Sequence, residues 1–262
     1  MSTILYLGPE GTHSHEAALQ HGDSRAKLVP CLSHYDVFER LCAPITRDRP
    51  VAIVPVENSS EGPVTQTLDQ LAAYPTVTVT NSFSIAVRHH LLVGPATRRL
   101  SAIQRVYSHP QALGQCRASL RALLPHAELM PDSSTAAAAR INGLAILKRN
   151  LQDNKKNSTR FFVITASRHP PRTCNKPCEF RSLIHLVIGN RPGALLHALS
   201  PFDAAGVNLT FIQSRPLPGR PWEYGFFIEA VTDWKSAAAE AAWRLVVALS
   251  ETGRQIGTYP VT

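Results

Sequence analysis

The first 165 residues alternate short apolar runs with segments of helical spacing, and this alternation restricts the chain to few architectures. The apolar runs are expected strands at Thr3–Leu7, Val51–Val56, Thr76–Asn81, Phe83–Val93 and Val106–Ser108. The segments of helical spacing are Ser14–His21, Gln66–Ala73 and Gln111–Leu124. Strands that alternate with helices in this way predict a parallel, doubly wound α/β domain.

The pattern changes after residue 165. Residues 166–180 hold several prolines, arginines and two cysteines without an apolar period, which is typical of a linker. The expected elements beyond it are a strand, helix, strand, strand, helix and strand at Ser182–Ile188, Ala194–Ala205, Leu209–Ser214, Trp222–Ala230, Ser236–Leu249 and Gln255–Val261. This βαββαβ order over about eighty residues predicts a ferredoxin-like arrangement for residues 181–262.

Charge, apolar runs and cysteine content indicate what the chain binds and in which compartment it is expected. The net charge of +8 comes from scattered Lys and Arg residues, so it does not predict nucleic-acid binding and fits attraction of a small polyanionic substrate. No apolar run is long enough to span a membrane, and the residues after Met1 lack the pattern of a signal peptide. Five cysteines without a regular framework favour reduced thiols. We therefore expect a cytoplasmic protein with no membrane partner.

Cys174 and Cys178, with His169 upstream, are the nearest approach to a metal-ligand cluster. Their spacing is not that of a zinc finger and a fourth ligand is missing, so we interpret them as linker residues. The sequence predicts no metal site.

Thr159 and Arg160 lie between a polar turn and the apolar run Phe161–Ile164, which is short, aromatic and β-branched and is expected to be a strand. A hydroxyl at the mouth of a strand can donate a hydrogen bond to a leaving group, and an arginine can hold a carboxylate by two contacts. The alternative is a threonine that caps its own turn beside a solvated arginine, since turns favour such residues. The local sequence leaves both interpretations open.

Four blocks along the chain resemble prephenate dehydratases, and they occur in the order found in that family. The blocks are Leu7–Glu16 (LGPEGTHSHE), Pro55–Gly62 (PVENSSEG), Tyr107–Cys116 (YSHPQALGQC) and Thr159–Phe161, the Thr-Arg-Phe signature. The resemblance implies a two-lobed, periplasmic-binding-protein-like catalytic domain over residues 1–165. Its second lobe is expected at residues 80–150.

Residues 181–262 resemble the ACT regulatory domain that is fused to enzymes of this family. Gly193–Leu196 (GALL) and Gln213–Pro216 (QSRP) match its two signatures, except that the family has Glu where Gln213 stands. The resemblance implies that L-phenylalanine binds as an allosteric effector between ACT domains that pair in a dimer or tetramer. The implied effector-binding residues are Gly193, Ala194, Leu195, Asn208, Leu209, Gln213, Ser214 and Arg215.

The resemblance also implies one reaction, in which prephenate loses water and carbon dioxide to give phenylpyruvate on the route to L-phenylalanine. This reaction needs no metal and no organic cofactor, so orientation and electrostatics must supply the catalysis. The implied catalytic residues are Thr159, as donor to the leaving hydroxyl, with Arg160, Glu57 and Asn58. Arg160 has a second interpretation, as part of a salt bridge within the protein.

The implied substrate-binding residues are Thr12, Ser14, Ser59, Ser108, Gln111, Gln115 and Phe161. Several are expected at the ends of strands or at the start of a helix, where open α/β sheets bind ligands and where backbone N–H groups bind anions. Five histidines are interpreted as lining of a polar site or as core groups rather than as acids or bases: His13, His15, His89, His90 and His109.

One departure from the family follows Arg140, where the chain passes directly to Ile141–Leu144. Roughly twenty residues of the second lobe are expected to be missing, which would leave strand edges unpaired. Three alternatives therefore accompany the dehydratase interpretation. They are an arogenate dehydratase, a catalytically weak phenylalanine-binding regulator and, disfavoured by the ACT domain, a solute-binding protein.

Overall fold

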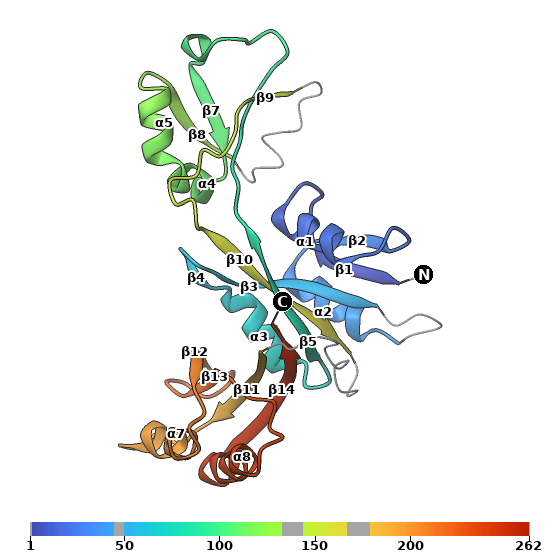
Figure 1. The fold of residues 1–262 in the computed structure, drawn as a ribbon, viewed down its shortest axis with the longest axis vertical. Coiled ribbons are helices and arrows are strands. Elements are labelled where there is room, and N and C mark those ends of the chain that lie inside the picture. Colours follow the sequence, from blue (N-terminus) through green and yellow to red (C-terminus); the bar gives the residue numbers. More distant parts are fainter. Residues whose placement is uncertain (1, 45–49, 133–143, 167–178, 262) are drawn as a thin grey trace.

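The structure, a computed structural model, describes residues 2–44, 50–132, 144–166 and 179–261 of the chain. It has three tiers, seen from top to bottom in Figure 1. The second lobe lies at one end, a central sheet in the middle, and a C-terminal sheet with two helices at the other end. The expected α/β fold with a C-terminal ferredoxin-like unit is confirmed.

The central sheet has the strand order β2-β1-β3-β10-β5, with the short β4 paired to β3. Its strands are β1 (Thr3–Leu7), β2 (Lys27–Cys31), β3 (Val51–Asn58), β4 (Gly62–Pro63), β5 (Thr78–Ala86) and β10 (Ser158–Thr165). Helices α1 (His13–His21), α2 (His34–Cys42) and α3 (Thr65–Ala73) connect them. Strand β10 runs antiparallel to both β3 and β5, so the sheet is mixed and the expectation of a parallel sheet was wrong. The reason is that the chain leaves the sheet along β5, builds the second lobe, and returns along β10.

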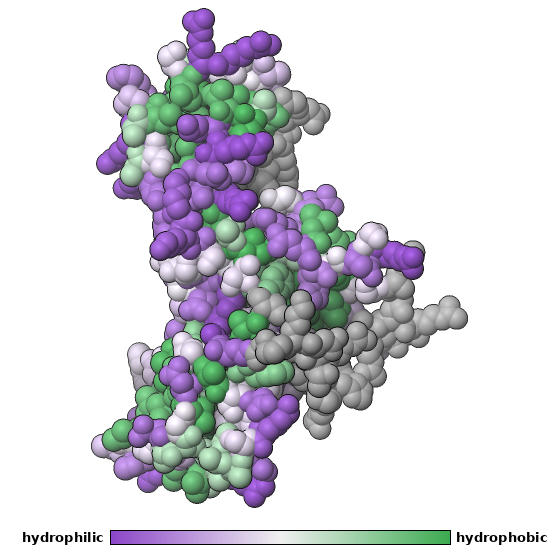
Figure 2. Space-filling model, viewed as in Figure 1, coloured by the Kyte–Doolittle hydropathy of each residue, from purple (hydrophilic) through white to green (hydrophobic). Residues whose placement is uncertain are grey.

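The second lobe contains two small sheets and their own apolar cluster. Strands β7 (Arg105–Ser108) and β8 (Glu128–Pro131) pair in parallel, while β6 (Leu91–Val93) and β9 (Ala145–Lys148) pair antiparallel. The helices are the 3-10 turn η1 (Leu100–Ala102), α4 (Pro110–Gln115) and α5 (Arg117–Leu123). On the face shown in Figure 2, hydrophobic residues gather on this lobe. The departure after Arg140 lies outside the described residues.

The C-terminal sheet has the order β12-β13-β11-β14 and carries two helices. Its elements are β11 (Phe180–Val187), α7 (Ala194–Ala204), β12 (Leu209–Pro216), β13 (Tyr224–Ala230), α8 (Ala237–Leu249) and β14 (Thr252–Pro260). One face of the sheet packs on α7 and α8 through Ile184, Phe202 and Val246. The other face joins Phe162 and Ile164 of β10 in a single apolar cluster. This second contact attaches the C-terminal unit to the central sheet.

Strand β10 is apolar on both faces. Phe161 and Val163 pack with Tyr6 and α1 on one face. Phe162 and Ile164 pack on the opposite face with the C-terminal sheet and with residues of α2 and α3. Because successive residues of a strand point to opposite faces, this continuous apolar run is what a doubly covered strand requires.

Several expected elements have different limits in the structure. The runs Thr76–Asn81 and Phe83–Val93 form one strand, β5, followed by a crossing to the short β6. The expected helix Gln111–Leu124 is divided at Cys116, because Asp153 accepts hydrogen bonds from the N–H groups of Ala118 and Ser119 and caps the start of α5. Strands β2, β4, β8 and β9, the 3-10 turn η1 and helix α2 were not predicted. Most of the expected linker lies outside the described residues.

Gly257 provides a test of the contact between the two sheets. A Cβ at this position of β14 would lie 2.2 Å from the carbonyl oxygen of Val79 on β5. We expect Gly257→Ala to destabilise the chain by about 1–3 kcal/mol, because backbone atoms cannot move aside as a side chain can. A lower Tm in a circular dichroism melt would record it.

The matched control is Gly114→Ala, since a Cβ at Gly114 meets no atom within 4 Å. Alanine favours a helix more than glycine does, so its Tm should stay constant or rise slightly. Equal Tm values for the two variants would contradict the close approach of β14 to β5.

Candidate active site

Thr159 is the second residue of β10 and lies opposite Asn58, the last residue of β3. The Asn58 side chain donates from Nδ2 to Thr159 Oγ1 at 2.9 Å and to the Ser158 carbonyl at 3.2 Å. Its Oδ1 accepts from the backbone N–H groups of Ser60 and Glu61 at 2.9 and 3.1 Å. These four bonds fix which side of the amide faces the threonine. Thr159 Oγ1 therefore accepts from Asn58, and its own proton remains available for donation to a ligand.

The loop after β3 is tied to the turn before β10. Ser59 Oγ donates to Asn157 Oδ1 at 3.1 Å and accepts from the N–H of Ser158 at 3.0 Å. The side chain of Asn154 donates to Ser60 Oγ at 3.1 Å. The hydroxyl of Ser59 thus joins the end of β3 to the start of β10. Its role in substrate binding stays a prediction.

Gln115 bridges the two lobes. From α4 of the second lobe it donates to Glu61 Oε1 at 3.2 Å, and its Oε1 lies 2.9 Å from His89 Nε2. An amide oxygen can only accept, so His89 carries its proton on Nε2. The His89 ring lies edge-on to that of His13, with 5.9 Å between centroids. Burial, and then the charge of His89, lower the pKa of His13, which favours its neutral form.

The sequence predicts His13 and His89 as lining of a polar site or as core groups, and Glu61 is not among its candidate residues. The sequence carried a partial signal for Glu61, since it lies three residues after Asn58 in the quoted block Pro55–Gly62. Its contact with Gln115 joins residues 54 positions apart, which no local pattern indicates.

A cavity of about 820 Å³ separates the N-terminal turn from the second lobe. Glu10–His13 form one wall, and Arg88–Gly94 and Gln104–Ser108 belong to the other side. The predicted substrate residues Thr12 and Ser108 line it, while Thr159 does not. Thr12 Oγ1 also caps α1 by accepting from the N–H of His15 at 3.3 Å and donates to the Pro9 carbonyl at 2.9 Å.

Three further predicted substrate residues have these positions. Ser14 is buried in the first turn of α1, and Gln111 is exposed in the first turn of α4. Phe161 is only 1% exposed and stacks with Phe83, with 6.0 Å between ring centroids. The expectation that Phe161 contacts substrate was therefore wrong, because its position in the doubly covered strand makes it a core residue.

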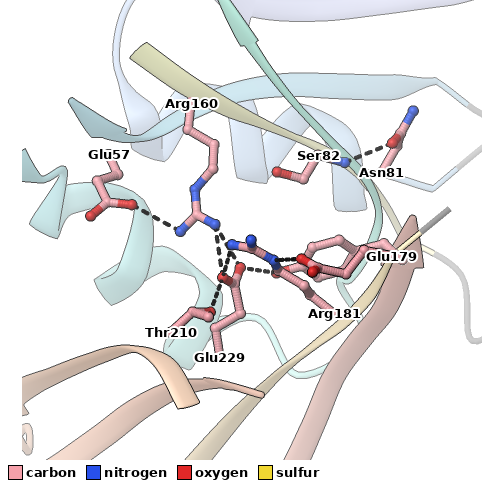
Figure 3. A network of polar contacts seen from close by, with 9 residues as sticks. Glu57, Asn81, Ser82, Arg160, Glu179, Arg181, Thr210 and Glu229 are labelled. Atoms are coloured by element: carbon pink, nitrogen blue, oxygen red, sulfur yellow. Dashed lines mark hydrogen bonds and ion pairs between the residues drawn. The ribbon is translucent and has the colours of Figure 1, made fainter. Parts of the chain in front are cut away.

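Arg160 and Glu57 point away from Thr159, toward the C-terminal sheet. Arg160 Nη2 lies 3.0 Å from Glu57 Oε2, and Nη1 contacts both carboxylate oxygens of the buried Glu229 at 2.9 and 2.8 Å (Figure 3). The expectation that Arg160 holds a substrate carboxylate is corrected by this geometry. The other interpretation, an internal salt bridge, describes the structure, and Glu57 orients Arg160 rather than the substrate.

The predicted effector residues lie around α7 and along β12. Gly193 precedes α7 with a φ of +76°, a left-handed conformation that glycine adopts without strain. Leu195 and Leu209 pack against the apolar cluster between the C-terminal sheet and its two helices. Ala194 is buried, and Asn208 lies in the loop before β12.

Further along β12, the Gln213 side chain donates to the carbonyl of Ser214. Arg215 makes a two-point ion pair with Asp69 of α3, with both distances 2.7 Å. Its guanidinium therefore links β12 to helix α3 of the central domain rather than facing the α7 end of the strand.

Neither a metal cluster nor a membrane-spanning helix is found in the described part of the chain. No group of three or more His, Cys, Asp or Glu side chains there could hold a metal ion. None of the helices there is long and apolar enough to cross a membrane. His169, Cys174 and Cys178 lie outside the described residues, while Cys31, Cys42 and Cys116 are free thiols.

Comparison with known proteins agrees with this arrangement. The family model for prephenate dehydratase matches residues 4–142, which is more than half of the chain. The chain belongs to the prephenate dehydratase family. A bifunctional chorismate mutase/prephenate dehydratase of Stutzerimonas stutzeri is 36% identical over 87% of the chain, and the match spans 65% of that relative's length. A prephenate dehydratase of Methanocaldococcus jannaschii is 32% identical, with 86% of this chain and 87% of the relative covered.

Among solved structures, the prephenate dehydratase of Arthrobacter aurescens in complex with L-Phe has a TM-score of 0.86 and 29% identity. The likeness covers 99% of this chain and 89% of that one, so it includes the C-terminal sheet. The prephenate dehydratase fold, including the C-terminal sheet, is therefore shared over nearly the whole chain.

Gln115 and Asn58 should respond differently to truncation. Gln115→Ala removes one contact to Glu61 and one to His89, and no backbone group loses a partner. We expect kcat/KM for prephenate to fall about tenfold while Tm stays nearly constant. Asn58→Ala should lower both quantities, because the N–H groups of Ser60 and Glu61 lose their acceptor. Parallel kinetics and thermal melts check this, and an equal loss of Tm in both variants would contradict it.

Proposed function

We propose that this chain catalyses the decarboxylative dehydration of prephenate to phenylpyruvate in L-phenylalanine biosynthesis. The observation that carries the proposal is the Asn58–Thr159 pair, in which the amide holds the threonine oxygen as acceptor and leaves its proton for a ligand. The family membership supplies the reaction, and this geometry supplies a group suited to its difficult step. A cytoplasmic enzyme fits the free thiols of the described residues.

The difficult step is departure of a hydroxide from the ring. As the C–O bond breaks, the electron pair of the departing carboxylate's C–C bond moves into the ring, which becomes aromatic, and carbon dioxide leaves. Negative charge grows on the leaving oxygen, and a hydrogen bond from Thr159 would stabilise it there. The hydroxide finally takes its proton from solvent, so no threonine alkoxide has to form.

The cavity between the lobes is the proposed place for the carboxylates of the substrate. One wall includes Thr12 and His13 at the start of α1, where free backbone N–H groups and the helix dipole favour an anion. The opposite wall contributes the cation Arg88 and the imidazole of His89. Gln115 contacts both His89, which lines this cavity, and Glu61, in the loop after β3 beside Thr159.

Two alternative functions can be distinguished from this one by assay. Arogenate dehydratase performs the same elimination on the amino-acid analogue, so both substrates have to be assayed side by side. A catalytically weak phenylalanine-binding regulator would bind the effector and turn over neither substrate. The ordered Asn58–Thr159 pair favours an enzyme over the regulator, because a regulator has no need of an oriented hydroxyl.

Thr159→Ala should lower kcat at least about a hundredfold and leave KM within several-fold, since the hydroxyl matters mainly in the transition state. Thr159→Ser keeps the hydroxyl and should keep much of the activity. The formation of phenylpyruvate, followed by its absorbance, measures both variants. Normal turnover of the alanine variant would remove Thr159 from the mechanism.

We further propose that L-phenylalanine regulates the enzyme through the C-terminal unit of a dimer or tetramer. The A. aurescens structure is a complex with L-Phe, which supports a phenylalanine-binding role for this fold. In this chain the start of α7 after Gly193 offers backbone N–H groups to the carboxylate of the ligand. Asn208 and Leu209, at the start of β12, offer a polar group and an apolar surface.

Phenylalanine binding should weaken when this region is changed. Asn208→Ala removes a polar group without strain. Gly193→Val forces a branched residue into a left-handed conformation and places its Cβ 3.1 Å from the His197 ring. We expect calorimetry to detect binding by the parent chain and weaker binding by both variants. Absence of binding at millimolar phenylalanine, or unchanged binding in the variants, would reject this site.

A further inference from the structure

Glu229 is a buried carboxylate that joins every strand of the C-terminal sheet to the central sheet. Its side chain, on β13, has no exposed surface. It accepts hydrogen bonds from Arg181 on β11 at 2.9 Å, from Thr210 on β12 at 2.8 Å and from Tyr259 on β14 at 2.7 Å. From β10 of the central sheet, Arg160 contributes two more bonds, and Figure 3 shows Arg160, Arg181 and Thr210 converging on this carboxylate.

The carboxylate stays ionised despite its burial. Burial by itself raises the pKa of Glu229, but the charge and hydrogen bonds of Arg160, together with the hydroxyls of Tyr259 and Thr210, outweigh it and lower the pKa below its ordinary value. A buried charge with all these partners is a rigid point in the structure, because any displacement would strip it of hydrogen bonds.

Arg160 is consequently clamped from two directions. Glu229 holds Nη1 and Glu57 holds Nη2, and the guanidinium is 13% exposed. Its Cζ atom also lies 5.6 Å from the ring centre of Phe162 and 6.0 Å from that of Phe211. Both distances are within the range of cation–π attraction.

The backbone of β10 is irregular where this clamp acts. The pairing of β10 with β3 shifts register between Arg160 and Phe161, so that Arg160 lies opposite Glu57 and Phe161 lies opposite Pro55. Proline has no N–H, which removes a ladder donor at the shift, and such irregularities re-aim neighbouring side chains. Regular hydrogen bonding between β10 and β3 therefore does not by itself determine the direction of the Thr159 hydroxyl.

We propose that Glu229 is a positioning residue for Thr159, acting through Arg160 from outside the catalytic domain. Neighbouring side chains of a strand point to opposite faces, so a guanidinium clamped on one face of β10 fixes the rotation of the strand and the direction of the hydroxyl on the other face. The C-terminal sheet thus contributes to turnover even without an effector. This inference rests on the proposed dehydratase activity.

A double-mutant cycle on the full chain, with prephenate as substrate, tests the proposal. Glu229→Gln keeps the size of the side chain and removes its charge. We expect it to lower kcat about tenfold in the parent chain while KM stays within threefold. In the Thr159→Ala background the same substitution should lower kcat by less than about twofold, because the hydroxyl it positions is absent.

The matched control is Asp69→Asn, which neutralises the carboxylate of a different ion pair between the C-terminal sheet and the central domain, that of Asp69 with Arg215 on β12. Its kcat should stay within about twofold of the parent value, since Asp69 belongs to α3 and does not contact β10 through this pair. A thermal melt of each variant gives the folded fraction, and kcat is expressed per folded enzyme.

An unchanged kcat for folded Glu229→Gln, or equal falls in the two backgrounds, would overturn the positioning role while leaving the dehydratase activity in place. A parent chain that does not turn over prephenate would reject the proposed function and this inference together, before any substitution is made. If Glu229→Gln does not fold, Tyr259→Phe removes a single hydrogen bond from the carboxylate. A smaller fall in kcat is then expected in the parent chain and none in Thr159→Ala, and equal effects in both would overturn the proposal.

Discussion

Strand β10 is covered on both of its faces, and the placement of the functional groups depends on this double cover. Thr159 contacts Asn58 at the end of β3 and Arg160 faces the C-terminal sheet, one residue apart. The apolar residues that follow, Phe161 and Phe162, keep the same alternation within two separate clusters. A slip of one residue would exchange the two environments, so the apolar pattern of the strand also determines which polar residue can reach a substrate.

The charges at this strand illustrate how buried ion pairs serve a fold. Such a pair gives little net stability over an apolar replacement, whereas removing one partner costs about 3–5 kcal/mol. The network of Glu229, Arg160 and Arg181 therefore orients the two sheets rather than strengthening their contact. Arg215 with Asp69, and Arg254 with the carbonyls of Leu71 and Pro75, add further directional contacts at α3.

Local patterns in the sequence were sufficient for most elements, whereas Thr159 became a candidate catalytic residue through the resemblance to prephenate dehydratases. The run from Phe161 to Ile164 predicted β10, and the order of elements beyond residue 180 predicted the ferredoxin-like sheet. What the sequence could not supply were relations between distant segments. The antiparallel direction of β10 follows from where the chain leaves the sheet. The break of the helix at Cys116 follows from Asp153, which lies 37 residues further along the chain, too far for a local sequence pattern to indicate. The ion-pair partner of Arg160 could not be predicted either, because Glu229 is 69 residues further along the chain.

The antiparallel β10 has a consequence for how length can vary in this fold. The second lobe is an insertion that begins at the end of β5 and finishes at the start of β10, two strands that are hydrogen-bonded neighbours. Its two ends are therefore held side by side by the sheet itself, whatever lies between them. Residues can be gained or lost inside the excursion without moving either anchor, so evolution can resize one wall of the cleft while the strand that carries Thr159 keeps its register.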